Sequence, residues 1–229
     1  MRHKFICGLG LFMLLFTLTC FSQQEYVSRF DAFGSYSFLS TPSLNLMQNG
    51  FNAEFGWNVR RWVALGGDFS VFTGSNTLIP SYLAPTVQAR LAPIITQLPT
   101  GYTLAVPANA TIYTYSAGPQ LNLRKLKTMT FFVRPALGAL HADISLKPGD
   151  PVSIAIVTKL IGPGMKTSDT VVFYGFGGGM DLNVSKHVGI RTAADFVHYD
   201  MFSGLLNGGR NSVRFSVGPT FRFGPNVPN

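Results

Sequence analysis

The sequence predicts an all-β fold, an eight-stranded antiparallel up-and-down barrel with its apolar side chains facing outward. Three observations predict it. Only 12% of the 229 residues are charged, whereas 13% are aromatic, including 20 Phe. This composition is typical of β-rich proteins in membranes and unlike that of a helical bundle. Apolar and polar residues alternate with period two along much of the chain, and short connections between these alternating segments are followed by long ones.

The first element is a secretory signal peptide over residues 1–22, followed by one barrel domain over residues 23–229. A basic start at 1–4 precedes an apolar run at 5–18 and small residues at 20–22, which is the order of a signal peptide. The alternative is a single membrane anchor, but the run is shorter than the roughly 20 residues that span a bilayer. Cys7 and Cys20 both lie in this segment. We therefore expect a cysteine-free mature chain without disulfides or thiolate metal sites.

Eight alternating segments follow the signal peptide. No apolar face of these segments contains Asp, Glu, Lys or Arg, and two charges inside one segment share a face. Phe33, Phe132 and Phe173 are exceptions that fall on polar faces. A soluble sheet turns its apolar face inward, whereas a membrane barrel turns it toward lipid, and segments of about 10 residues suit a tilted membrane crossing. The segments are 26–38, 51–60, 62–72, 111–124, 128–141, 172–184, 188–199 and 213–223.

The alternation assigns individual residues to the two surfaces of the barrel. We expect the outward aromatic residues to face lipid, namely Phe30, Phe55, Trp57, Phe69, Phe131, Phe176, Phe196, Phe215, Phe221 and Phe223. We expect the inward charged residues to pair across the lumen, because unpaired buried charges are costly. These residues are Arg29, Asp31, Glu54, Asp68, Arg134, Asp181, Arg191, Asp195 and Arg214. A barrel of eight strands is just wide enough to be filled by such side chains.

The connections distinguish a membrane barrel from the alternative, a soluble lipocalin-like barrel. The short links at 60–61, 125–127 and 185–187 alternate with long ones at 39–50, 73–110, 142–171 and 200–212. Short periplasmic turns and long extracellular loops are typical of outer-membrane barrels. The stretch 73–110 is apolar for a loop, and we expect a short helix or an extra hairpin there, which leaves a ten-stranded barrel as an alternative. Pro119, Pro135 and Pro219 fall inside strands, where we expect bulges or weakened pairing.

Across roughly residues 26–223 the chain resembles the eight-stranded outer-membrane barrel proteins of the OmpA-like transmembrane class. The matching motifs are FDAFGSYSF at 30–38, GGMDL at 178–182 leading into VGIR at 188–191, and VRFSVGPTFRF at 213–223. The resemblance implies a location in the outer membrane of a Gram-negative bacterium. It also implies contact with outer-membrane lipid and lipopolysaccharide, and with the outer-membrane insertion machinery during assembly.

The function predicted from these features is a structural or surface-interaction role with a lumen filled by charged side chains. A porin-like small-solute channel is one alternative. A second alternative, an outer-leaflet lipid-modifying enzyme, comes from resemblance to lipid A-modifying barrels. It would use His141, Asp143 and Ser145, or His198 and Asp200. Residues two apart in a strand lie about 7 Å from each other, too far for a Ser–His pair. We therefore predict no catalytic residues, metal, cofactor or nucleic-acid partner.

Overall fold

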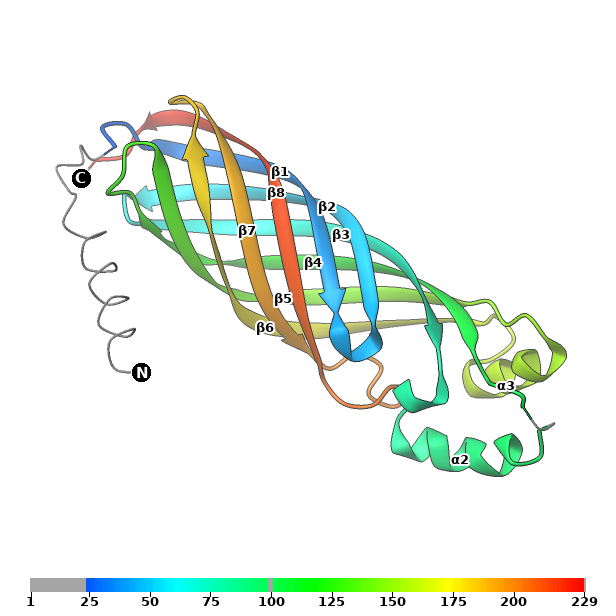
Figure 1. The fold of residues 1–229 in the computed structure, drawn as a ribbon. Coiled ribbons are helices and arrows are strands. Elements are labelled where there is room, and N and C mark those ends of the chain that lie inside the picture. Colours follow the sequence, from blue (N-terminus) through cyan, green and yellow to red (C-terminus); the bar gives the residue numbers. More distant parts are fainter. Residues whose placement is uncertain (1–23, 99–100, 229) are drawn as a thin grey trace, which may run out of the picture.

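Eight antiparallel strands close into one barrel in the computed structural model, which describes residues 24–98 and 101–228 (Figure 1). Each strand pairs with its sequence neighbours, and the first pairs with the last. The predicted topology is confirmed, and the ten-stranded alternative is wrong. The signal peptide predicted at 1–22 lies outside the described residues. The strands are β1 (Ser28–Thr41), β2 (Leu46–Arg60), β3 (Val63–Leu78), β4 (Val106–Leu123), β5 (Met129–Leu146), β6 (Lys166–Asn183), β7 (Val188–Tyr199) and β8 (Arg210–Asn226).

The two ends of the barrel differ in their connections. At one end, which we call the turn end, residues 61–62, 124–128 and 184–187 link neighbouring strands. At the other, the loop end, residues 79–105, 147–165 and 200–209 form longer connections. The long connection predicted at 39–50 is wrong because the alternation continues through it. Leu46 and Gln48 are buried while Met47 is exposed, so only residues 42–45 separate β1 from β2.

Besides β2, four more strands continue well past their predicted bounds at the loop end. β3 contains 16 residues, and β4, β5 and β6 contain 18 each, whereas about 9–11 residues of a tilted strand cross a bilayer. Pairing persists to Leu78 with Val106 on β3 and β4, and to Ser145 with Lys166 on β5 and β6. These strands therefore rise on one side of the barrel (Figure 1). We call their outer parts, together with the two helices that they carry, the extension.

Two α-helices cap the extension. α2 (Pro85–Ile95) lies in the β3–β4 connection, which confirms the helix expected within 73–110, and α3 (Pro151–Ile161) lies in the β5–β6 connection. Both begin with Pro, whose fixed φ suits the first helical position. Asp150 caps α3 by accepting the N–H groups of Val152 and Ser153. Within the described residues, none of the helices has the length and apolar character needed to cross a membrane.

The strand prolines interrupt the hydrogen-bonded wall. Between β4 and β5, pairing stops after Ser116 with Gly138 and resumes at Leu121 with Val133 in the same register, which places Pro119 opposite Pro135. The Lys147 N–H donates to the Pro107 carbonyl across this pair of strands. In an antiparallel pair of strands, every second residue pair is joined by backbone hydrogen bonds. By this spacing Pro119 and Pro135 form such a pair, but neither has a backbone N–H to donate, so both hydrogen bonds are missing. The prediction of weakened pairing is confirmed at this seam.

Pro219 has a smaller effect on the joint between β1 and β8. The pairing that surrounds Pro219 is interrupted over a short stretch. It stops after Phe33, which pairs with Thr220, and resumes at Tyr36, which pairs with Val217. Gly218 lies in this gap, and a Cβ there would stand 2.0 Å from the Gly34 carbonyl oxygen. Glycine therefore permits the close backbone approach at this point.

Candidate functional site

Charged side chains fill the middle of the barrel and its interior toward the turn end. The inward positions of the strands carry Asp31, Glu54, Asp68, Asp181, Arg191, Asp195 and Arg214, all of them buried. The Arg134 side chain is also turned inward and is 12% exposed. Charges in such a position are tolerated only when they are paired and hydrogen-bonded. The contacts between them therefore decide whether the interior is a filled core or an open path.

A chain of ion pairs crosses the lumen. Arg134 on β5 donates to Glu54 on β2 over 2.6 Å and to Asp195 on β7 over 3.1 Å. Arg191 on β7 donates to the other Glu54 oxygen over 2.6 Å and to Asp181 over 2.7 Å. Two strands intervene between β2 and β5, and two between β7 and β2. These bonds therefore tie separate parts of the wall together through the interior.

Arg214 continues the chain toward the loop end. Its guanidinium donates to Asp195 over 2.8 Å, to Asp68 on β3 over 2.5 Å and to the Ser70 hydroxyl over 2.8 Å. Asp68 also lies 3.9 Å from Arg134. Charge-assisted bonds of this length are the strong ones, and several share one carboxylate. The ion pairs therefore form one connected network, which we call the lumen network.

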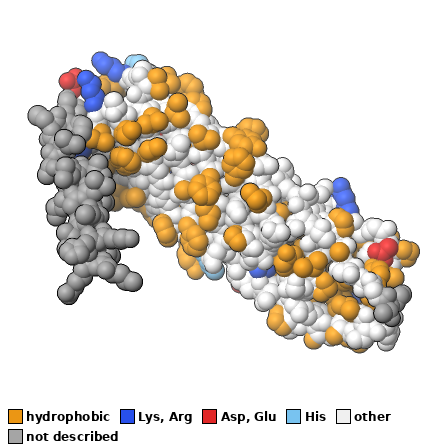
Figure 2. All heavy atoms as spheres, in the orientation of Figure 1, with side chains coloured by type: hydrophobic (Ala, Val, Ile, Leu, Met, Phe, Trp, Pro, Cys, Tyr) orange, Lys and Arg blue, Asp and Glu red, His pale blue; other side chains and the backbone are white. Residues whose placement is uncertain are grey.

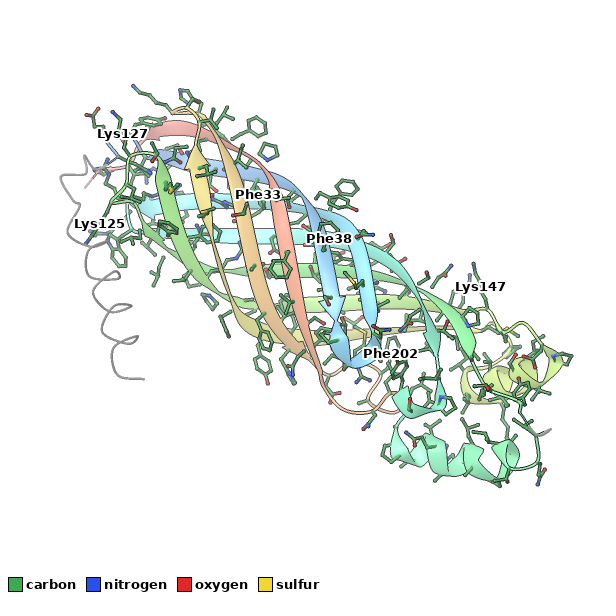
Figure 3. The ribbon with its side chains drawn as sticks, in the orientation of Figure 1. Phe33, Phe38, Lys125, Lys127, Lys147 and Phe202 are labelled. Atoms are coloured by element: carbon green, nitrogen blue, oxygen red, sulfur yellow. The ribbon has the colours of Figure 1, made fainter. Side chains whose placement is uncertain are left out.

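Two inward aromatic residues support the arginines. The Arg191 guanidinium lies 5.3 Å from the ring centroid of Phe33 and 4.9 Å from that of Phe132, and Arg134 lies 5.7 Å from Phe132. These distances suit cation–π attraction, which strengthens when the cation is desolvated. Phe33, labelled in Figure 3, is 3% exposed. Two of the three aromatic residues that broke the polar faces in the sequence, Phe33 and Phe132, are therefore partners of the lumen network.

The membership of the lumen network differs in part from the predicted set. Arg29 forms no ion pair within the described chain, because the irregularity between Ser28 and Phe30 takes it out of the strand alternation. Arg222 was not predicted, yet it donates to Asp181 over 3.0 Å. Its phase with Arg214 on β8 was the signal that could have identified it.

Arg124 extends the polar contacts into the turn after β4. Its guanidinium donates to the Asn58 side chain and to the Arg61 carbonyl, both over 2.9 Å. Asn58 in turn donates to Asp31 over 3.0 Å. Burial lowers the pKa of Arg124 to about 10, which leaves it protonated at neutral pH. Arg124 follows the inward-facing Gln120 and Asn122 at intervals of two residues, and this alternation could have identified it from the sequence.

A large cluster of apolar side chains lies in the interior toward the loop end. Leu39, Phe72, Leu140, Phe173 and Val197 are buried there in one cluster. The cluster continues into the helices and the last loop through Val87, Leu91, Ile156, Val157, Phe202 and Leu206. Figure 3 shows Phe202 at this end. This apolar plug closes the barrel above the lumen network, and the sequence interpretation did not anticipate it.

The histidines singled out from the sequence lie on the outer surface. His141 Nδ1 lies 2.7 Å from the Thr170 hydroxyl, and its Nε2 lies 3.5 Å from Asp143. Within the described residues no hydrogen bond joins His141 to Ser145. His198 lies 2.8 Å from the Asn211 side chain and forms no ion pair with Asp200 in the described part of the chain. The structure therefore brings His141 close to Asp143, but it does not join His141 to Ser145 or His198 to Asp200.

The predicted lipid-facing residues lie on the exterior, where Figure 2 shows apolar side chains over the barrel wall. Phe30 is half-buried because its ring lies 5.8 Å from both Phe55 and Phe223. The others have exposed side chains, namely Phe55, Trp57, Phe69, Phe131, Phe176, Phe196, Phe215, Phe221 and Phe223. We call this surface the apolar belt.

The apolar belt ends at a defined row of paired residues. Tyr113, His141 and Thr170 are register partners on β4, β5 and β6. The next outward-facing rows, toward the loop end, are Thr111, Asp143 and Ser168, then Asn109, Ser145 and Lys166. Every residue of these two rows is polar. The exterior therefore changes from apolar to polar where the extension begins.

Within the described residues, no cluster of three His, Cys, Asp or Glu residues could hold a metal ion. No protein-family model matches the sequence, and the comparison with curated proteins finds no match.

Comparison with solved structures identifies similar barrels. Neisserial surface protein A is 11% identical with a TM-score of 0.53, covering 85% of this chain and 96% of that chain. OprG from Pseudomonas aeruginosa is 9% identical with a TM-score of 0.49, covering 88% and 99%. Ail of Yersinia pestis is 14% identical with a TM-score of 0.48, covering 86% and 97%. The likeness to Neisserial surface protein A supports the eight-stranded barrel fold alone.

Proposed function

We propose that this chain is an integral outer-membrane barrel protein with a closed lumen and a role in structure or surface interaction. The observation that carries the proposal is the inverted polarity of the barrel. Phe176 and Phe215 are 68% and 54% exposed on the outside, whereas Arg191 and Asp195 are 2% and 1% exposed inside. A protein surrounded by water does the reverse, and a bilayer favours this arrangement. In this placement the turn end faces the periplasm and the extension stands outside the cell.

Spin labelling tests the membrane placement. The mature chain is expected to lack cysteine, so Phe215→Cys and Ser216→Cys each provide one labelling site on opposite faces of β8. We expect the label at position 215 in reconstituted protein to collide with dissolved oxygen and to be shielded from a water-soluble nickel complex. The label at 216 is the matched control inside the barrel. Ready access of the nickel complex to position 215 would refute the placement.

Two features of the interior favour a closed barrel over the small-solute channel. The lumen network spans the interior with hydrogen bonds of 2.5 to 3.4 Å, and the apolar plug lies toward the loop end. Opening a path would break ion pairs between buried side chains, which is costly. We expect no steady large conductance in planar bilayers, and steady openings by the purified protein would contradict the closed lumen.

The extension is the part that we propose for surface interaction. Strands that cross a bilayer need no such length, and this chain uses the excess to hold α2 and α3 outside the membrane. Lipopolysaccharide surrounds this region in the proposed placement, and the insertion machinery would act earlier, during assembly. Replacement of exposed Ile154 on α3 by Asp, with Ile190→Asp in the apolar belt as comparison, separates the two regions. We expect I154D to assemble normally and I190D to impair insertion.

The geometry does not favour the lipid-modifying alternative, because within the described residues neither His141 nor His198 forms a hydrogen bond with a serine. His141 instead lies at the edge of the apolar belt, at the level proposed for lipid headgroups. Mass spectra of lipid A from cells with and without the protein test this. We expect identical spectra, and a modification that depends on His141 would favour an enzyme.

A further inference from the structure

Basic residues gather at the turn end of the barrel. Each turn there carries or adjoins at least two of them, and Arg222 on β8 lies beside the turns; the set is Arg60, Arg61, Arg124, Lys125, Lys127, Lys186, His187 and Arg222. Glu25 is the one acidic residue of the described chain at this end, since the others lie in the lumen or toward the loop end. Figure 2 shows this concentration of Lys and Arg, and Figure 3 labels Lys125 and Lys127 within it. The turn end is therefore strongly positive.

The outermost cations of this set are available to an external anion. Arg60, Lys125, Lys127 and Lys186 are exposed, and within the described residues none of them lies within ion-pair distance of a carboxylate. Clustered like charges repel one another. An anion that bridges the turns relieves this repulsion and accepts charge-assisted hydrogen bonds.

A concave site lies among these residues. A cavity of about 350 Å³ opens at the turn end, and its lining includes Arg124, Lys127, Lys186 and Arg222 together with one carboxylate, that of Glu25. Since a water molecule occupies about 30 Å³ of liquid, this space holds a phosphate group and its remaining hydration. Phosphate is a preferred partner of Arg and Lys side chains.

Exposed apolar residues lie directly next to the cations along the chain. Trp62 follows Arg61, Leu123 precedes Arg124, and Val184 lies two residues before Lys186; these three apolar side chains are 59%, 53% and 68% exposed. The surface therefore passes from the apolar belt to a ring of cations within one or two residues. A phospholipid has the matching order, with acyl chains beside a charged phosphate.

We propose that the turn end binds anionic phospholipids of the membrane leaflet that faces the periplasm. The phosphate lies among the cations of the turns, and the acyl chains lie along the apolar belt. This inference rests on the proposed membrane placement. It goes further by assigning a lipid class to one end of the barrel.

Native mass spectrometry of the full-length mature protein in detergent tests the inference. Phosphatidylglycerol, which is anionic, and phosphatidylcholine, which has no net charge, are titrated in parallel with identical acyl chains, so that the two lipids differ only in the headgroup. We expect wild-type protein to bind phosphatidylglycerol at least fivefold more tightly. The variant Lys125→Gln/Lys127→Gln/Lys186→Gln should lose this preference, since a basic residue near an anionic lipid surface contributes about fivefold. The matched control, Lys147→Gln/Lys159→Gln/Lys166→Gln at the loop end, should keep it.

Three results would overturn the inference. Equal binding of the two lipids by wild-type protein means that charge does not select the lipid. An equal loss in both triple variants means that the turns are not the site. Tight binding of soluble glycerophosphoglycerol means that the site takes a free phosphate ester instead of a lipid. The spin labels at 215 and 216 report membrane placement independently of lipid charge, so failure of the inference is distinguishable from failure of the proposed function.

Discussion

Removal of the Arg191 guanidinium is the most direct test of the lumen network. Arg191 donates to Asp181 over 2.7 Å, to Glu54 over 2.6 Å and to Asp31 over 3.4 Å. Arg191→Met keeps the aliphatic part of the side chain but leaves these carboxylates with fewer partners. Breaking a buried ion pair from one side costs about 3–5 kcal/mol. Because Glu54 still contacts Arg134, and Asp181 still contacts Arg222, we expect a loss of about 3 kcal/mol.

The assay is reversible urea unfolding in lipid vesicles, followed by the fluorescence of Trp57 and Trp62. Arg60→Met is the matched control, because Arg60 is exposed and a surface substitution should change stability by less than about 0.5 kcal/mol. Adding Asp181→Asn to Arg191→Met should recover part of the loss, since it removes one uncompensated charge. Equal small losses, below about 1 kcal/mol, for Arg191→Met and Arg60→Met would refute the reasoning and indicate a hydrated lumen.

Three further predictions concern other parts of the barrel. Pro135→Val restores one backbone donor at the β4–β5 seam and should stabilise the protein by about 1 kcal/mol in the same urea titration; an unchanged midpoint would contradict the missing bond. Phe132→Leu should cost about 1–2 kcal/mol by removing a ring from beside two guanidinium groups, whereas its exterior neighbour Phe131→Leu should cost less. Hydrogen bonds from Ser153, first from its hydroxyl and then from its N–H, lower the pKa of Asp150. The cap of α3 is therefore complete above the ordinary pKa near 4 and is lost as pH falls through the lowered value. The amide protection factors of α3, which are corrected for the intrinsic exchange rate at each pH, should fall through that acid range and, in Asp150→Ala, should be low already at pH 7.

The strand phases could be predicted from the sequence because a one-residue shift moves every side chain to the opposite face. The outward placement of Phe176 and the inward placement of Asp195 follow directly from period two. The charged residues of the network were recognisable for the same reason, since an apolar face contains none of them. Their specific pairs were not predictable. Whether Arg191 contacts Glu54 depends on how the barrel closes and on its shear, and neither can be read from the sequence of a single strand.

The strand ends and the apolar plug were harder to predict. Beyond the apolar belt, the outer face carries polar residues such as Asp143 and Lys166, so the contrast between the faces is lost although β5 and β6 continue. The inward residues there, such as Leu140 and Ala142, are apolar because loops cover them. The sequence pattern therefore reverses its polarity along one strand, and a prediction built on a single phase ends the strand too early.

The unequal height of the barrel gives the loop end a tall side and a low side. β3 to β6 carry the helices on one side, whereas only residues 42–45 join β1 to β2 on the other (Figure 1). In the proposed placement, a neighbouring membrane protein could approach closely on the low side, while the tall side would hold bulky sugar chains apart. Rotation about the membrane normal would then change what the protein presents to its surroundings. A partner that docks from the side would then bind the barrel in one preferred orientation about the membrane normal.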